Sequence, residues 1–198
     1  NEASQTVTFT LTTDNDALFS TLPAVDAATG DLNYTPGADM NGSATISVTL
    51  HDNGGTANGG VNVSATQSFS ITVQPVNDAP VVSNVPKSGL VNAPLAFTAA
   101  DFTAAFADVD GDALVKIRVE WLPAHGELRL NGTAVTLQQE ILAADLGALQ
   151  FIPQQNWFGS TIFGWNGSDG TVYAAQTAQV QIDIAPWPYS VFIPVLNK

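Results

Sequence analysis

Three aspartates stand within five residues, in the sequence Asp108-Val-Asp-Gly-Asp112. Alternate side chains of an extended loop project to one side, so at least two of the three carboxylates, on Asp108, Asp110 and Asp112, could reach the same ion. Calcium prefers about six to eight hard oxygen ligands, drawn from carboxylates, carbonyls and water. The cluster therefore predicts a calcium site.

A second polar stretch, Pro75-Val-Asn-Asp-Ala-Pro80, precedes this cluster by some thirty residues and adds the side-chain oxygens of Asn77 and Asp78. The cluster is not a helix-loop-helix calcium loop, because its glycine is the fourth residue instead of the sixth and Val119 stands where such a loop needs glutamate. A metal-free alternative stays open. The aspartates could form a turn in which they accept hydrogen bonds from backbone amides.

The charge balance is strongly acidic. The chain has 5 basic and 18 acidic residues, for a net charge of −13, and residues 1–77 contain no lysine or arginine. Nucleic acids and anionic membranes are bound by clustered cations, so neither is a predicted partner. The acidity favours cations as ligands, although solubility alone would also account for it.

Catalytic motifs are missing from the sequence. There is no cysteine, which excludes disulfides, thiolate nucleophiles and thiol metal sites. The two histidines, His51 and His125, accompany no Gly-x-Ser-x-Gly or His-Glu-x-x-His motif. Nothing singles out a glycosidase pair among the many carboxylates. We expect that the chain is not an enzyme.

Alternation of apolar and polar residues predicts the elements that position these groups. The alternation is typical of half-buried strands, and Asn-Gly and Asp-Gly turns separate the segments, as in a β-sandwich. One exception is Ala99 to Ala107, where Phe102 and Phe106 stand four apart and predict a short helical turn. The predicted strands are residues 7–11, 32–34, 46–50, 69–73, 95–97, 115–121, 128–130, 149–151, 163–165 and 180–184.

The sequence repeats internally. Aligning Gly30 with Gly147 without gaps also aligns Tyr34 with Phe151, and Asp52 with Asp169. Two copies of one module are therefore predicted. Only residues 1–6 precede Val7, whereas about 35 residues precede the corresponding strand of the second copy. We therefore expect the first module to lack its opening strands and to have an unpaired sheet edge.

Several motifs, in order along the chain, resemble the cadherin-like tandem repeats of large bacterial surface and secreted proteins. They span most of residues 78–184. The motifs are Val76-Asn-Asp-Ala-Pro80, Asp108-Val-Asp-Gly-Asp-Ala-Leu114, Leu122-Pro-Ala-His-Gly-Glu-Leu128, Leu149-Gln-Phe-Ile-Pro153, Asn156-Trp-Phe-Gly159 and Ser168-Asp-Gly170.

The resemblance implies an all-β fold of two tandem Greek-key β-sandwich modules of the cadherin and immunoglobulin type. Their expected bounds are residues 1–77, incomplete at the N-terminus, and 78–185, followed by an apolar tail at 186–198. It also implies calcium held by the linker, the acidic loop and an aspartate before the last strand. With the third loop aspartate added, the expected ligands are Asn77, Asp78, Asp108, Asp110, Asp112 and Asp169. The acidic residues that a preceding cadherin module supplies have no clear counterpart in residues 1–77, which favours a site within the second module.

The aromatic residues and the tail have competing interpretations. Trp121 and Trp165 occupy inward strand positions and favour core packing, whereas Trp157 and Phe158 are expected to be exposed. The tail either folds back over the sandwich or adds Val191–Leu196 to an open sheet edge. Proline at position 194 would limit such pairing.

We therefore expect a calcium-binding structural or adhesion module of an extracellular bacterial tandem-repeat protein that spaces or presents other domains. Such a protein would be secreted or on the cell surface. Its expected partners are neighbouring repeat modules, a cell-surface protein or glycan, and further copies of itself through strand exchange. No run of apolar residues predicts membrane insertion. The alternatives are a carbohydrate- or other ligand-binding module and an accessory region of a large exported enzyme.

Overall fold

The computed structural model describes residues 5–187 and divides the chain into two compact units, Asn1–Val76 and Asn77–Lys198, here called unit 1 and unit 2. The predicted all-β class is confirmed, because strands form most of the regular structure. Every strand predicted from alternation corresponds to a strand in the structure. The tail interpretations concern residues beyond position 187 and lie outside the described residues.

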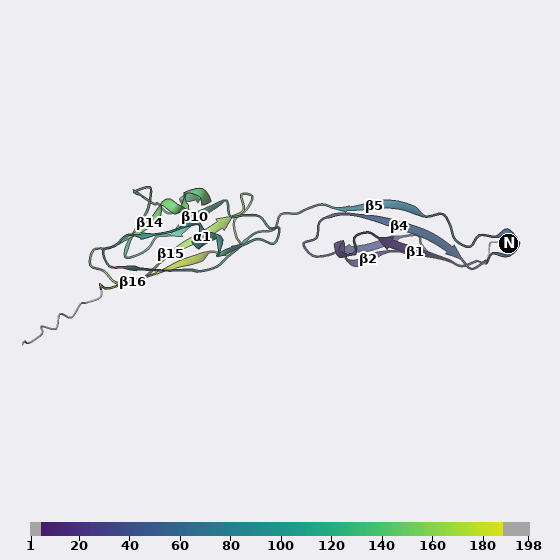
Figure 1. Cartoon of the computed structure of the whole chain (residues 1–198), viewed down its shortest axis with the longest axis horizontal. Helices are drawn as coiled ribbons and strands as arrows, with labels where there is room; N and C mark the ends of the chain where they lie inside the picture. The colour runs from purple at the N-terminus through teal and green to yellow at the C-terminus, as the bar shows by residue number, and fades with distance from the viewer. Residues whose placement is uncertain (1–4, 188–198) are drawn as a thin grey trace, which may run out of the picture. The chain divides into compact units, whose positions relative to one another are not determined.

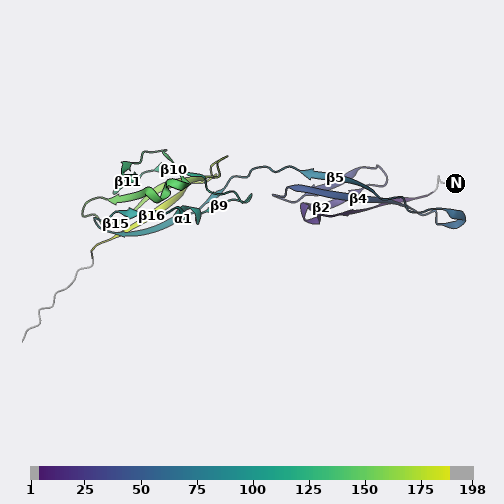
Figure 2. The ribbon, with the colours of Figure 1, turned by 45° about the horizontal axis from the view of Figure 1, so that its top comes forward.

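Unit 1 contains a three-stranded antiparallel sheet in the order β1-β4-β5 and a separate β2-β3 pair. Figures 1 and 2 show β4 and β5 side by side along their length. Its elements are β1 (Val7–Thr13), η2 (Asp16–Leu18), β2 (Phe19–Val25), β3 (Leu32–Pro36), β4 (Gly42–Asp52), η3 (Ala57–Gly59) and β5 (Gln67–Val73).

Unit 2 has two larger sheets, in the orders β13-β10-β15-β16-β7 and β12-β11-β14-β8, and a small β6-β9 ladder. The short α-helix, α1, lies beside these strands (Figure 2). The elements of unit 2 are β6 (Val81–Val82), β7 (Val85–Leu90), β8 (Leu95–Ala96), α1 (Ala99–Thr103), β9 (Phe106–Ala107), β10 (Lys116–Trp121), β11 (Gly126–Leu130), β12 (Thr133–Ala134), β13 (Glu140–Leu142), η4 (Ala143–Ala148), β14 (Leu149–Pro153), β15 (Gly159–Ser168) and β16 (Ala178–Ala185).

The core of unit 2 is aromatic at its centre. Trp165 is fully buried, and its ring meets that of Phe102 edge to face with 5.2 Å between centroids. Phe97 and Phe163 make a second edge-to-face pair at 5.7 Å. Such pairs add stability beyond the apolar area that they bury.

Trp121 departs from the prediction. It was expected to point inward, but 37% of its surface is exposed. A bulge in β10 is the cause, because Val119 pairs with Trp165 and Trp121 pairs with Gly164, so two residues of β10 advance against one of β15. The extra residue turns the following side chains to the other face. The Trp121 ring lies against the backbone of Gly164, which leaves no space for a Cβ atom there.

Candidate metal centre

A two-residue ladder brings the two acidic stretches of unit 2 together. Val81 of β6 pairs with Ala107 of β9, and Val82 pairs with Phe106. The ladder places the residues that precede Val81 beside those that follow Ala107. The backbone amide of Asp78 consequently donates to Oδ2 of Asp110 at 2.7 Å, across 32 residues of chain.

The loop after β9 gathers its three aspartates. One carboxylate oxygen from each of Asp108, Asp110 and Asp112 lies within 4.8 Å of the others. Gly111, between the second and third, has a φ of 84°, a backbone conformation that glycine adopts without strain. Leu114 is 7% exposed and anchors the end of the loop in the core. In the sequence, Gly111 between Asp110 and Asp112 is the feature that indicates a turn here.

The two oxygens of Asp108 have different surroundings. Oδ1 accepts hydrogen bonds from the backbone amides of Asp110 at 2.8 Å and Asp112 at 3.5 Å, so the turn offered as the metal-free alternative is present. Oδ2 is buried, and no residue between 5 and 187 hydrogen-bonds to it. The turn therefore accounts for only half of this carboxylate.

Among residues 5–187, no basic side chain forms a salt bridge with the cluster. The salt bridges in the described part of the chain are Lys87–Asp101, Lys116–Glu140, Arg118–Glu120 and Arg129–Glu127. Close carboxylates repel each other, and an unsatisfied buried oxygen costs about 1–3 kcal/mol. A divalent cation would offset two of the cluster's three negative charges and give Oδ2 of Asp108 a partner. The residues therefore fit a hard cation such as calcium.

Asp169 lies close to Asn77 but outside the three-carboxylate cluster. Its Oδ2 accepts a hydrogen bond from the Asn77 side-chain amide at 3.0 Å. Its Oδ1 accepts from the amides of Thr171 at 2.6 Å and Val172 at 2.7 Å. Oδ2 of Asp169 thus fixes the side chain of Asn77, and Oδ1 fixes the backbone at Thr171 and Val172.

The pKa of Asp169 follows from these contacts. Desolvation by burial raises it, but the hydrogen bonds from Asn77, Val172 and Thr171 outweigh that effect and leave the pKa below its ordinary value. The carboxylate is therefore ionised at neutral pH. Of the six predicted ligands, three form the cluster, Asp78 joins it through its backbone amide, and Asn77 and Asp169 form a neighbouring pair.

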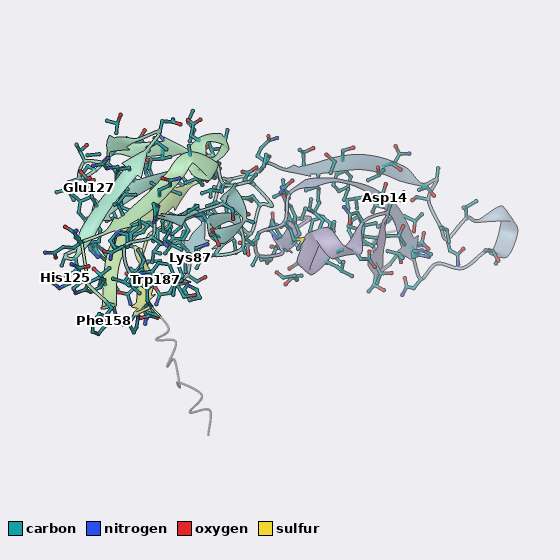
Figure 3. All side chains as sticks on the ribbon, turned by 60° about the vertical axis from the view of Figure 1, so that its left-hand side comes forward. Asp14, Lys87, His125, Glu127, Phe158 and Trp187 are labelled. Carbon is teal, nitrogen blue, oxygen red and sulfur yellow. The ribbon has the colours of Figure 1, made fainter. Side chains whose placement is uncertain are left out.

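A group of aromatic residues lies at another part of unit 2. Phe158, directly before β15, is 60% exposed, and Trp187, just after β16, is 55% exposed (Figure 3). Trp157 was expected to be exposed with Phe158, but it is half-buried against the core. Its ring stacks on His125 with 4.8 Å between centroids and 17° between planes. Exposure of Trp157 was wrongly predicted because its stacking partner, His125, is 32 residues away in the sequence.

Comparison with known proteins places these features in a family. A sequence profile of the cadherin-like domain matches residues 76–185, which include the β6-β9 ladder, the acidic loop and Asp169. The chain belongs to the cadherin-like domain family. No curated protein sequence matches it.

Solved structures of similar fold include human protocadherin-24 EC1-2, with 14% identity, a TM-score of 0.50, and coverage of 95% of this chain and 85% of that one. Human mucin-like protocadherin EC1-2 has 14% identity and a TM-score of 0.49, over 92% and 84% of the two chains. An endo-fucoidan hydrolase of glycoside hydrolase family 107 has 18% identity and a TM-score of 0.36, over 93% of this chain. This chain spans 24% of the hydrolase's length. The protocadherin-24 match supports the cadherin-like fold alone.

Within the described residues, no helix has the length and apolar character needed to cross a membrane.

Proposed function

We propose that unit 2 binds a calcium ion at the acidic loop, with Asp108, Asp110 and Asp112 as the central ligands and Asn77, Asp78 and Asp169 beside them. The observation that carries the proposal is Oδ2 of Asp108, a buried carboxylate oxygen without a hydrogen-bond partner among residues 5–187, next to two further carboxylates. Carbonyl oxygens and water would complete the coordination.

The proposed role is structural. Unit 2 would act as a rigid cadherin-like module that spaces or presents neighbouring domains of an extracellular protein. Bound calcium would fix the acidic loop against the residues that follow Val76, because Asp78 already hydrogen-bonds to Asp110. A fixed entry segment makes the module a stiffer spacer.

The proposed role is also non-catalytic. His125 stacks on Trp157, and His51 lies 3.3 Å from the hydroxyl of Thr49. A histidine base needs both a nucleophile within reach and an orienting acid. Neither histidine contact supplies that pair.

Thermal unfolding of the full chain in calcium, magnesium or chelator tests the proposal. A ligand that binds only the folded state stabilises it by about 2.7 kcal/mol at a hundredfold excess over Kd. We expect calcium to raise the midpoint well above that in chelator, and magnesium to do so less because it demands a stricter geometry. An unchanged midpoint in saturating calcium would rule out the site.

Glycan binding is the second candidate function, favoured by the exposed rings of Phe158 and Trp187. Exposed aromatic rings can stack on the apolar faces of sugars. We expect that any glycan bound here on an array would be lost in Phe158→Ala and retained in Leu142→Ala, which removes a side chain of similar exposure elsewhere in unit 2. Binding that survives Phe158→Ala would contradict this use of the surface.

A further inference from the structure

The bulge in β10 brings an aromatic ring to the outer face of the five-stranded sheet of unit 2. Before the bulge, Val119 is buried in the core and pairs with Trp165. After it, Trp121 pairs with Gly164 and is 37% exposed. Bulges re-aim the side chains that follow them, and they are frequent beside functional sites. A specific feature of the backbone thus places Trp121 on the surface.

Gly164 provides the space in which this ring lies. A Cβ atom on Gly164 would overlap the six-membered ring of Trp121 and would meet three of its atoms at nearly equal distances. The ring therefore lies with one face on the strand, and its other face accounts for the exposed surface. A glycine inside a strand often marks a place where another group must approach closely.

The apolar surface continues along β15. Ile162 lies two residues before Gly164, so both are on the same face of the sheet. The Ile162 side chain is 40% exposed. The indole ring and this side chain together form an apolar strip across the middle of the outer face.

Amide side chains from β16 line one side of the strip. Gln179 pairs with Gly164, and Gln181 pairs with Ile162. Directly opposite residues of an antiparallel pair project from the same face, so both amides stand beside the strip. Each amide group can donate and accept hydrogen bonds.

A fixed carboxylate lies on the other side of the strip, on Glu120. Its Oε1 accepts a hydrogen bond from Nε of Arg118 at 2.8 Å, and its Oε2 accepts one from Nε2 of Gln138 at 3.0 Å. Arg118 is itself held by Tyr173, with 4.4 Å between the guanidinium carbon and the ring centroid. Each oxygen of Glu120 keeps a further lone pair, so the carboxylate can accept more hydrogen bonds in a fixed orientation.

The position of the strip within the sheet argues against a peptide ligand. The strands β10, β15 and β16 are all interior, because the order is β13-β10-β15-β16-β7. Their backbone groups are used on both sides, so an extended peptide could not add to them as a strand. A ligand here must be recognised by side chains alone.

The side chains suit a sugar. A pyranose has an apolar face of C–H groups and a rim of hydroxyls, which an aromatic ring and the flanking amide and carboxylate groups can match. The charges of Arg118 and Glu120 are paired with each other, which favours a neutral sugar over a charged one.

We propose that this surface binds a neutral glycan by stacking one sugar ring on Trp121. The Trp121 surface is defined by Trp121, Ile162, Glu120, Gln138, Gln179 and Gln181. It does not involve the acidic loop. Gly164 is six residues, about 20 Å of strand, from Phe158, so the Trp121 surface is distinct from the exposed ring of Phe158.

Calorimetric titration of the full chain with short soluble oligosaccharides of glucose, galactose, mannose and xylose tests the proposal. We expect at least one of them to bind. Trp121→Ala should weaken that binding by at least about tenfold, whereas Phe158→Ala should leave it unchanged. Absence of binding to all four, unchanged binding in Trp121→Ala, or a loss in Phe158→Ala would overturn the proposal. Lower stability with unchanged binding would mean that the ring only covers Gly164.

A second substitution tests the orientation of the ring while keeping all its atoms. Gly164→Ala introduces a Cβ that must push the ring off the strand. Gly147→Ala is the matched control, because a Cβ there would meet no neighbouring atom. We expect weaker sugar binding in Gly164→Ala alone, with the unfolding transition of unit 2 still present. Equal binding by these two variants would contradict the assigned position of the ring.

Oxidative footprinting locates the bound sugar with an internal control. Trp121 and Trp187 are both exposed, so both indoles should be oxidised in the free protein. We expect the oligosaccharide that binds in the titration to slow oxidation of Trp121 and to leave that of Trp187 unchanged. Equal protection of the two indoles, or protection of Trp187 alone, would place the sugar elsewhere and overturn the proposal.

Discussion

The two carboxylate oxygens of Asp108 have different roles. Oδ1 accepts the amides that shape the loop, and Oδ2 is buried beside Asp110 and Asp112 without a partner among the described residues. An asparagine at this position keeps an oxygen for the amides and removes the charge. A single substitution, Asp108→Asn, can therefore separate the shaping of the loop from the proposed binding of a cation.

We expect the effect of Asp108→Asn on thermal stability to change sign with calcium. In chelator the variant should equal or exceed the wild type, because carboxylate repulsion is relieved. In calcium at a hundredfold excess over Kd it should lose most of the roughly 2.7 kcal/mol that the wild type gains. Asp145→Asn, an exposed aspartate outside the cluster, is the control and should respond to calcium as the wild type does.

At the scale of elements, the start of α1 depends on Asp101. Its carboxylate accepts hydrogen bonds from the backbone amide and the hydroxyl of Thr98. It also forms an ion pair with Lys87, with 3.0 Å between Nζ and Oδ2. Desolvation by burial raises the pKa of Asp101, but these contacts outweigh it and hold the pKa below 3.8, its ordinary value. The helix in turn carries the buried Phe102 into the core.

Asp101→Ala should therefore destabilise unit 2 by about 1–2 kcal/mol at pH 7, because it removes the N3 half of the capping box formed with the N-cap residue Thr98. Because the folded-state pKa is depressed, this contribution is complete above the unfolded value and is lost as pH falls through the folded value. The difference in unfolding free energy between variant and wild type should thus shrink below about pH 4. Denaturant titrations at several pH values measure it, and a pH-independent difference would contradict the assigned contacts.

The elements show how far the sequence could predict the structure. Strict alternation located strands such as β5 and β16. The Phe102–Phe106 spacing indicated a helical turn over Ala99–Ala107, but α1 ends at Thr103 and Phe106 lies in β9. β7 was missed because Pro86 and Gly89 interrupt its apolar pattern. The bulge that exposes Trp121 depends on pairing with β15, so no local signal foretold it.

The candidate site divides in the same way. Asp108, Asp110 and Asp112 are adjacent in sequence, and their convergence could be predicted. The hydrogen bond from Asp78 to Asp110 depends on the β6-β9 ladder, which is only two residues long and gives no periodic signal. Asp169 could be placed beside Asn77 only through the family resemblance.

For the whole molecule, the two units differ in the size of their cores. Among the described residues, unit 1 has a cluster of 5 buried apolar residues and unit 2 has one of 19. Burial of apolar surface is the main favourable term in folding, so unit 1 should be the less stable unit. The chain should not unfold as a single two-state system.

Calorimetry should accordingly resolve two transitions, with unit 1 unfolding at the lower temperature. Calcium should raise only the upper transition, because the acidic cluster lies wholly within unit 2. Cleavage by a protease just below the upper midpoint should remove unit 1 and leave a fragment that begins near Asn77. A single transition that moves as a whole with calcium would refute this division of stability.

The parallel pairing of β7 with β16 has a mechanical consequence. These strands lie near the entry and exit of unit 2, so tension between the chain ends pulls them in opposite directions along their axes and loads the hydrogen bonds of six residue pairs together. An antiparallel hairpin pulled at its open end would instead lose its hydrogen bonds one by one. In single-molecule stretching, unit 2 should therefore rupture at a distinctly higher force than unit 1.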